Sequence, residues 1–418
     1  MFPAVALAVL LADGVRLAPR QTDVPATSAA RTADVLTIAD AVAQARSRSS
    51  LVAAARERQQ AAVRARQFVA GAANPLLELR GENYGAGKAA RQPRDVFATL
   101  SQPVELGGKR QARTAAAEAV STLAATETAT EEWAASLEAA ELYVDALRAR
   151  ESLVLLAEQR QGVAQTVSFL AERLREGVAA EADLRRFETE RTRLASQEAR
   201  TSLAMQTALL RLSALLGREV SAGQLDMPEI AAAGAQTGPP VEAAIALRPD
   251  VQAAAARLQR AEATAALERA RGVPDLTVTA GYKRTSGLNT GIVGISLPIA
   301  LFDRNRVAIA HAAGDISAAR LDLEYVRQQA RADAEARWRT AQTLAAQAAL
   351  VDTTLIAPAE IVRTAARASF LEGRGDVLQL VDAERVYGEA AREALELRLD
   401  AILSSIGARL AAGAPLHP

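Results

Sequence analysis

The chain has 418 residues, of which 50% are hydrophobic but only 3% aromatic, and alanine is the commonest of the apolar residues. Its 49 Lys and Arg residues balance 49 Asp and Glu residues, so nucleic acid is not an expected partner. The absence of cysteine excludes disulfides and thiolate metal sites, and two histidines (His311 and His417) are too few for a histidine-built zinc site. Alanine favours helix and close helix packing, which suits long packed helices better than a compact globule.

The N-terminal segment 1–34 predicts a possible export signal and a disordered stretch. Residues 2–12 are apolar and have the length of a signal-peptide core, although no basic residues precede them. The alternative is a disordered tail throughout. No run of 18 apolar residues occurs along the chain, so the sequence predicts no transmembrane helix.

The first structural unit is expected over residues 35–217. A helix from Thr37 to Ala70, with Thr37 as its cap, precedes a β-hairpin over 75–103 with a polar loop at 85–94. Pro103 is expected to end the second strand, because proline has no N–H to donate. A helical hairpin over 105–216 follows, with its outgoing helix ending near 173 and its return helix over 181–216.

Apolar residues on both helices of this hairpin alternate in steps of four and three, which is the spacing of a coiled-coil seam. They are Trp133, Leu137, Ala140, Val144 and Leu147 on the outgoing helix, and Met205, Leu209, Leu212 and Leu216 on the return helix. An antiparallel helical hairpin is therefore more consistent with the pattern than two independent core helices.

Residues 218–240 are rich in Gly and Pro and predict a linker. The same order of elements as in the first unit is then expected again over 241–410. The second unit has a helix that is re-capped at Arg248-Pro249, a β-hairpin over 274–299 with a loop at 287–290, and a helical hairpin over 303–410. Pro298 is expected to stop the fourth strand. A short tail, 411–418, ends the chain.

The two units align with an offset of about 196 residues, which indicates an internal duplication. In this alignment the tip residues Glu176-Gly177 correspond to Glu372-Gly373. Gly162 corresponds to Pro358, and a helix break is predicted at each of these two residues.

Each predicted strand is about ten residues long, which is enough to cross a bilayer when tilted. Four strands cannot close a barrel, so membrane strands would require at least eight from an oligomer. Alternation alone leaves open a soluble four-stranded sheet that caps a helical bundle.

Six segments in this order resemble the outer-membrane factor (TolC-type) family of tripartite efflux systems, and within it the CzcC-like heavy-metal branch. The resemblance covers roughly residues 36–410. The segments are Asn74-Pro75, LELRGENYG at 77–85, LSQPVELGGKRQAR at 100–113, RPDVQAAAARLQRAEA at 248–263, ISLPIALFDRNRVAIAHA at 295–312 and FLEGRGDVLQLVDAERVY at 370–387.

The resemblance implies a mainly α fold with a small β part, assembled as a homotrimer in the outer membrane. Each protomer would give four strands to a shared 12-stranded β-barrel, and its helical hairpins to a periplasmic α-barrel. The implied partners are a periplasmic adaptor, an inner-membrane pump of the RND type and outer-membrane lipid. No cofactor and no enzymatic activity are implied, and residues 218–240 would form an equatorial segment.

The resemblance also implies roles for particular residues. The strand-to-helix junction would comprise Pro103, Gly107, Gly108, Pro298, Asp303 and Asn305, and the helical tips that contact adaptor or pump would comprise Glu176, Gly177, Glu372 and Gly373. The family's paired acidic gate positions fall on Gln379 and Asp382 in the second repeat and on Asp183 and Arg186 in the first. Its tip aromatic is Phe370, and Arg374 lies one position from its gate arginine.

The resemblance implies a passive exit duct for metal cations, with drugs or other small molecules as the alternative substrates. A ring of Asp183 or Asp382 would attract cations, whereas the alternative is that both are ordinary polar residues near a helix start. The alternative class of protein is a soluble periplasmic coiled-coil scaffold or an adaptor. An adaptor is disfavoured because the chain has two hairpins and a duplicated strand pair.

Overall fold

The structure, a computed structural model, describes residues 35–82, 84, 94–228 and 242–412. The expected export signal and disordered stretch at 1–34, most of the polar loop at 85–94 and residues 413–418 of the tail lie outside the described residues.

The helical part begins with two helices, α1 (Ile38–Arg48) and α2 (Ser50–Val69), where the sequence predicted one. Thr37 caps α1 as predicted, because its hydroxyl accepts from the Asp40 backbone N–H at 3.1 Å. The single helix was wrong because Ser49 takes an extended conformation, with ψ 132°. The Arg56 guanidinium stabilises this break by donating to two carbonyls of the last turn of α1, at 2.8 and 3.2 Å.

The first helical hairpin consists of α3 (Lys109–Arg175) and α4 (Glu181–Leu216). The bounds of α4 agree with the prediction for the return helix. At 1.5 Å per residue the 67 residues of α3 extend about 100 Å. The predicted break at Gly162 is wrong, since α3 continues through it. Glycine removes only a side chain and leaves the helical hydrogen bonds in place.

The second helical hairpin contains α7 (Arg306–Val351), the π-helical segment η3 (Asp352–Ile356), α8 (Ala357–Leu371) and α9 (Val377–Ala411). The predicted break at Pro358 is confirmed, because the helix changes to the π form just before it. Proline cannot donate to the preceding turn and its ring crowds a carbonyl there, so the regular hydrogen-bond ladder is lost.

Between the hairpins lie η2 (Ala222–Gln224), α5 (Glu242–Ala246) and α6 (Pro249–Arg271). Pro249 begins α6 as predicted. Two residues of the described part of the predicted linker, 218–228, are buried in the core: Val220 and Leu225, of which Leu225 forms a parallel bridge with Leu36. Residues 229–240 lie outside the described residues.

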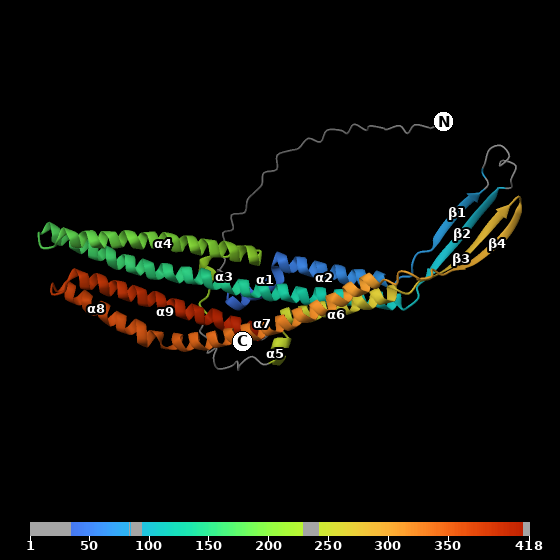
Figure 1. The fold of residues 1–418 in the computed structure, drawn as a ribbon. Helices are drawn as coiled ribbons and strands as arrows, with labels where there is room; N and C mark the ends of the chain where they lie inside the picture. The colour runs from blue at the N-terminus through green and yellow to red at the C-terminus, as the bar shows by residue number, and fades with distance from the viewer. Residues whose placement is uncertain (1–34, 83, 85–93, 229–241, 413–418) are drawn as a thin grey trace, which may run out of the picture. The chain divides into compact units, whose positions relative to one another are not determined.

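The main core surrounds the middle of α3, where α1, α4 and α9 pack against it (Figure 1). Tyr143 is fully buried here, and its hydroxyl lies 2.7 Å from the carbonyl oxygens of both Leu36 and Asp226. It also accepts from the Asp226 backbone N–H at 2.8 Å. One side chain thereby ties α3 to the segments before α1 and after η2.

The strands β1 (Leu76–Glu82), β2 (Asp95–Val104), β3 (Leu276–Thr285) and β4 (Leu288–Ser296) form one antiparallel sheet in the order β1-β2-β3-β4. The central β2–β3 pair joins the two sequence repeats. Pro298 lies beyond β4 as predicted, but Pro103 does not end its strand. Pro103 lies inside β2, opposite Thr277 of β3. The pairing of β2 with β1 ends at Ser101, so the missing N–H of Pro103 costs no hydrogen bond to β1.

The predicted loop over 287–290 was too long. The β3–β4 turn is Ser286-Gly287, both with positive φ (49° and 92°), and Leu288 already belongs to β4. Such two-residue turns match the twist of the strands they join.

Candidate functional site

The sheet has one apolar and one polar face, and the pairing register shows which residues share each. Directly opposed residues lie on the same face, and successive residues alternate. Leu79 pairs with Ala98, Ala98 with Tyr282, and Tyr282 with Gly291. By the same alternation, the apolar residues on this face are Leu77, Leu79, Val96, Ala98, Leu100, Val278, Ala280, Tyr282, Val293 and Ile295. The same face carries Arg284 and Asn289 near the strand ends at the β3–β4 turn and Gln102 near the helical end.

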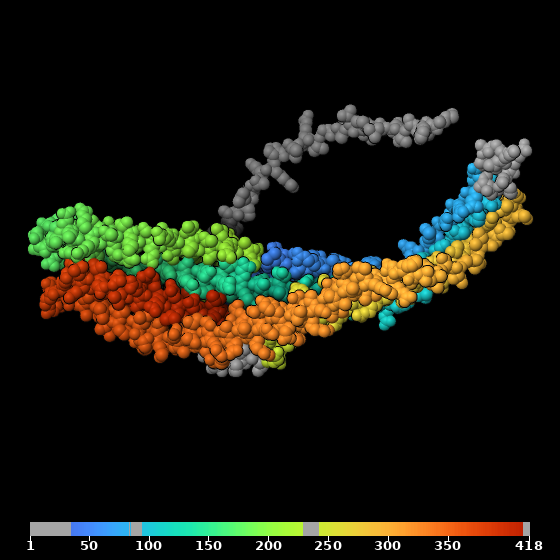
Figure 2. All heavy atoms as spheres, viewed as in Figure 1, coloured from blue at the N-terminus to red at the C-terminus, as the bar shows by residue number. Residues whose placement is uncertain are grey.

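The apolar face is exposed. Leu79, Val293 and Ile295 are 74%, 85% and 72% exposed, respectively. No helix packs on either face of the sheet within the described residues, and Figure 2 shows no helical atoms over the visible face. A soluble sheet buries its apolar face against another layer, so the predicted alternative of a sheet capping a helical bundle does not describe this arrangement.

The opposite face is polar and internally paired. The Ser101 and Thr279 hydroxyls lie 2.9 Å apart, and Lys283 Nζ lies 3.0 Å from Asp95 Oδ2. Lys283 also lies over the ring of Phe97, 4.8 Å from its centroid. These contacts between β2 and β3 join residues that lie more than 170 positions apart in the chain.

The two outer strands, β1 and β4, each have one edge without a strand partner among the described residues. Backbone groups on such an edge need a hydrogen-bond partner in lipid, where no water is available. The sheet is therefore complete in a membrane only if further strands close it.

The strand-to-helix junction is built around two glycines with left-handed backbone. Gly107 and Gly108 have φ of 67° and 72°, and a Cβ on Gly107 would lie 2.7 Å from the Val273 side chain. Asp275 fixes the turn, because its carboxylate accepts from the Leu106 N–H at 3.1 Å and lies 2.7 Å from Lys109 Nζ.

The corresponding turn in the second repeat uses Asn305 at φ 59° as the residue before α7. Its backbone N–H donates to Asp303 Oδ1 at 2.8 Å, and its side-chain amide donates to the Glu268 backbone carbonyl at 2.9 Å. Both predicted junctions thus contain a positive-φ residue immediately before the long helix.

The two helical tips have the same backbone geometry. Gly177 and Gly373 have φ of 76° and 75°, and each ends its outgoing helix with exposed residues around it. The tips contact each other through Phe169 of α3 and Phe370 of α8, whose rings are 5.5 Å apart and edge to face. Phe370 is 5% exposed, so its side chain lies between the two hairpins.

The candidate gate residues Asp183, Arg186, Gln379 and Asp382 are on the first two turns of the return helices α4 and α9. Asp183 pairs with Arg186 at 3.8 Å, whereas Asp382 pairs with Arg385 at 2.8 Å. Gln379 is exposed on α9. In both repeats the arginine lies three residues after the aspartate. Arg186 is itself a predicted gate residue, whereas the sequence analysis did not name Arg385.

The remaining predicted tip residues are exposed, and Arg374 forms an ion pair with Glu372 within its own tip. Glu176 lies at the end of α3 in the other tip.

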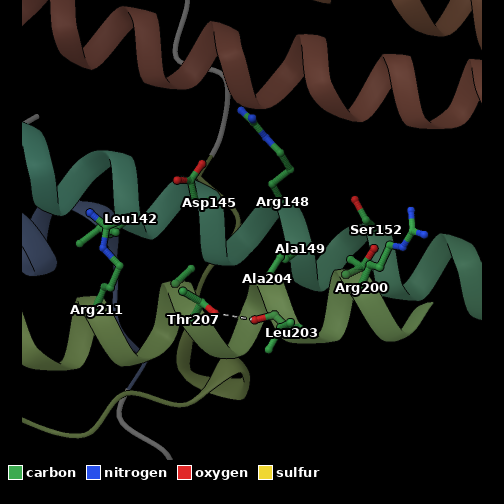
Figure 3. A pocket seen from close by; sticks show the side chains of 12 residues that line it. Leu142, Asp145, Arg148, Ala149, Ser152, Arg200, Leu203, Ala204, Thr207 and Arg211 are labelled. Carbon is green, nitrogen blue, oxygen red and sulfur yellow. Dashed lines mark hydrogen bonds between the residues drawn. The ribbon is translucent and has the colours of Figure 1, made fainter. Parts of the chain in front are cut away.

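A groove of about 690 Å³ lies between α3 and α4, farther from the tips (Figure 3). Its floor lies where the small residues Ala149 and Ala204 face each other, and Leu203 and Arg200 line its α4 side. Arg148 points from α3 toward α9, where it pairs with Asp400 at 2.6 Å. The groove is a consequence of alanine packing between the helices, and it brings together no set of metal ligands.

Among the described residues, no group of three or more His, Asp or Glu side chains is arranged to hold a metal ion. One helical stretch, Arg306–Leu371, is long and apolar enough by composition to cross a membrane. The sequence analysis predicted no such helix. This stretch is the α7–α8 arm of the second hairpin, and most of its apolar part is exposed in the single chain.

The fold is shared with solved outer-membrane channels. The structure of CusC, described with transmembrane channel formation, aligns with a TM-score of 0.74 and 18% identity, covering 90% of this chain and 92% of that one. The outer membrane protein VceC of Vibrio cholerae aligns with a TM-score of 0.75 and 17% identity, covering 91% and 97%. The chain therefore has the TolC-type channel fold.

Sequence comparisons show similarity to one family and to several resistance proteins. Residues 241–414 match the outer membrane efflux protein family. The nickel-cobalt-cadmium resistance protein NccC of Alcaligenes xylosoxydans xylosoxydans is 32% identical over 266 residues, 62% of this chain and 60% of that protein. The cobalt-zinc-cadmium resistance protein CzcC of Cupriavidus metallidurans is 26% identical over 327 residues, 76% of this chain and 75% of that protein. The second repeat of the chain is thus similar to outer membrane efflux proteins, and a longer part of the chain is similar to these metal-resistance proteins.

Proposed function

We propose that this protein is the outer-membrane exit duct of a tripartite efflux system and conducts metal cations passively to the exterior. The observation that carries the proposal is the two-faced sheet. Its apolar face is exposed, its polar face is internally paired, and neither outer edge has a partner among the described residues. Lipid outside and water inside a closed barrel satisfy all three features.

Three copies supply the strands that one copy lacks. Each copy brings four strands, and a homotrimer closes a 12-stranded barrel with no free edge. The long helical hairpins continue below the sheet as the periplasmic α-barrel, and residues 218–228 of the predicted linker belong to its equatorial segment. The exposed apolar residues of α7 and α8, such as Leu321 and Ile361, pack against neighbouring copies in this assembly.

The helical tips close the periplasmic end and contact the adaptor and the pump, which we infer to be of the RND type. Asp183 and Asp382, repeated around the threefold axis, place carboxylates near the pore. Arg186 and Arg385 neutralise these acids in part, and Phe370 holds the two tips of one copy together. No step of chemistry is assigned to the duct, because the pump supplies the energy.

Metal cations are the proposed substrate because the related proteins NccC and CzcC are named for nickel, cobalt, cadmium and zinc resistance. The duct itself need not bind the ion, in keeping with the lack of a ligand cluster in the described part of the chain.

Deletion of the gene in the native host tests this assignment. We expect lower tolerance of nickel, cobalt, zinc or cadmium, more of that metal retained in the cell, and restoration of both by the plasmid-borne gene. Unchanged metal tolerance together with increased sensitivity to dyes or detergents would reassign the substrate to small organic molecules. No phenotype with either class, in cells shown to produce the protein, would contradict an export role.

A further inference from the structure

The polar face of the sheet carries five charged side chains: Glu78, Arg80, Glu82, Asp95 and Lys283. Their shared face follows from the register, because Arg80 pairs with Phe97 and Phe97 with Lys283, and Glu78 and Glu82 lie two residues on either side of Arg80. In the proposed barrel all five face the lumen.

Four of these five charges neutralise each other. Arg80 forms an ion pair with Glu82, and Lys283 forms one with Asp95. Both cations also lie over Phe97, at 5.8 and 4.8 Å from the ring centroid. The carboxylates and the aromatic ring hold the two cations in place.

Glu78 remains uncompensated, since it has no hydrogen bond, ion pair or ring contact in the part of the chain that the structure describes. Its row across the sheet is uncharged and consists of Thr99, Gly281 and Ile292. Arg80 lies about 7 Å along the strand and is already engaged by Glu82.

We propose that Glu78 sets the charge selectivity of the barrel lumen and makes it prefer cations. The inference rests on the proposed function. Each copy contributes a net charge of −1 from this face, and three copies place three free carboxylates at one height around the lumen. Rings of carboxylates favour cations in pores. This preference suits a duct whose cargo is a divalent metal cation.

The test uses the purified full-length protein in planar phospholipid bilayers, with a KCl gradient across the membrane. The reversal potential of the wild-type channel indicates cation preference. Glu78→Gln shifts that potential toward zero, whereas Glu78→Asp, which keeps the charge, leaves it unchanged. Lys283→Gln removes a cation from the same face and shifts the potential in the opposite direction to Glu78→Gln.

The outcomes separate the two proposals. If the wild-type protein forms no trimer that inserts into the bilayer, the proposed duct itself is contradicted. If it conducts and Glu78→Gln has the wild-type reversal potential, the duct stands and the role of Glu78 is wrong. The oligomeric mass of each variant is measured first, so that a shift is read only from an assembled channel.

Discussion

At the scale of single residues, Tyr143 shows how the helical part is held together. Its hydroxyl has one proton to donate, to the carbonyl of Leu36 or Asp226, and it accepts from the Asp226 N–H. Burial raises the pKa of Tyr143 from 10.0 to about 12, and the backbone hydrogen bond to Asp226 offsets only part of this rise.

This shift predicts a loss of stability at alkaline pH. The unfolded chain loses the Tyr143 proton near pH 10, and the folded chain keeps it until about pH 12. The stabilisation linked to this proton is therefore full below pH 10 and is lost as the pH rises from 10 to 12. Denaturant unfolding between these values should show a falling midpoint, and Tyr143→Phe should reduce that fall. Tyr325→Phe, at a 61% exposed position, is the control and should leave it unchanged.

Arg248 is the other unusual buried residue, at 3% exposure. Its guanidinium pairs with Asp250 at 2.8 Å and Asp333 at 2.9 Å and lies over the Trp133 ring at 5.2 Å. It thus connects the start of α6 with α7 and α3.

We expect Arg248→Ala to reduce the free energy of unfolding by about 2–3 kcal/mol, through lost packing, the cation–π contact and the two carboxylate pairs. Arg211→Ala is the matched control: Arg211 is 62% exposed and 4.0 Å from Glu138, so its removal should cost less than about 0.5 kcal/mol. Thermal unfolding in detergent measures both. Equal losses for the two variants would argue against a structural role for the buried arginine.

At the scale of elements, local sequence patterns predicted many of the element bounds. The predictions were wrong where contacts between residues distant in the sequence determine the bounds. The α4 bounds, the Thr37 cap and the start of α6 at Pro249 followed from helix periodicity and capping. The break at Ser49 did not, because Arg56 has to reach back to stabilise it. Pro103 was placed at a strand end because the sequence does not show which β2 edge lacks a partner.

The two glycines of the first junction test how that turn is built. Gly108→Ala meets only the strain of positive φ, since nothing lies within 4 Å of the added Cβ, and should cost about 1 kcal/mol. Gly107→Ala adds a close contact with Val273 at 2.7 Å, so its cost should be about 2–4 kcal/mol. Melting temperatures of the two variants should therefore differ clearly, with Gly107→Ala lower. The reverse order would contradict the packing of Val273 against this turn.

At the scale of the whole molecule, the sequence predicted the duplicated frame and the candidate site residues, but not how charges are paired across it. Lys283 with Asp95 and Lys109 with Asp275 join the two repeats over more than 160 positions. Alternation predicted a dry face on each strand. The pairing register shows that the apolar sides of the four strands form one exposed surface. The outer edges of β1 and β4 have no strand partner among the described residues.

Neighbouring residues on opposite faces of β2 test the orientation of the barrel. Leu100→Arg places a charge on the apolar face and should destabilise the membrane-inserted protein by about 2–4 kcal/mol if the position lies near the bilayer midplane. Thr99→Arg places the same charge on the polar face, where water fills the proposed lumen, and should be tolerated. The fraction of each variant recovered in outer-membrane preparations reports the difference. Equal recovery would contradict the assignment of the faces.

The central claim is that three copies close one barrel in the outer membrane, and the oligomeric mass of the membrane-extracted protein tests it most directly. Extraction with detergent, followed by light scattering corrected for bound detergent, should give three times the chain mass. Heating should convert this species to monomers, and omission of detergent should leave the protein in the membrane pellet. A monomer or dimer that is soluble without detergent would contradict the barrel and indicate a soluble helical scaffold.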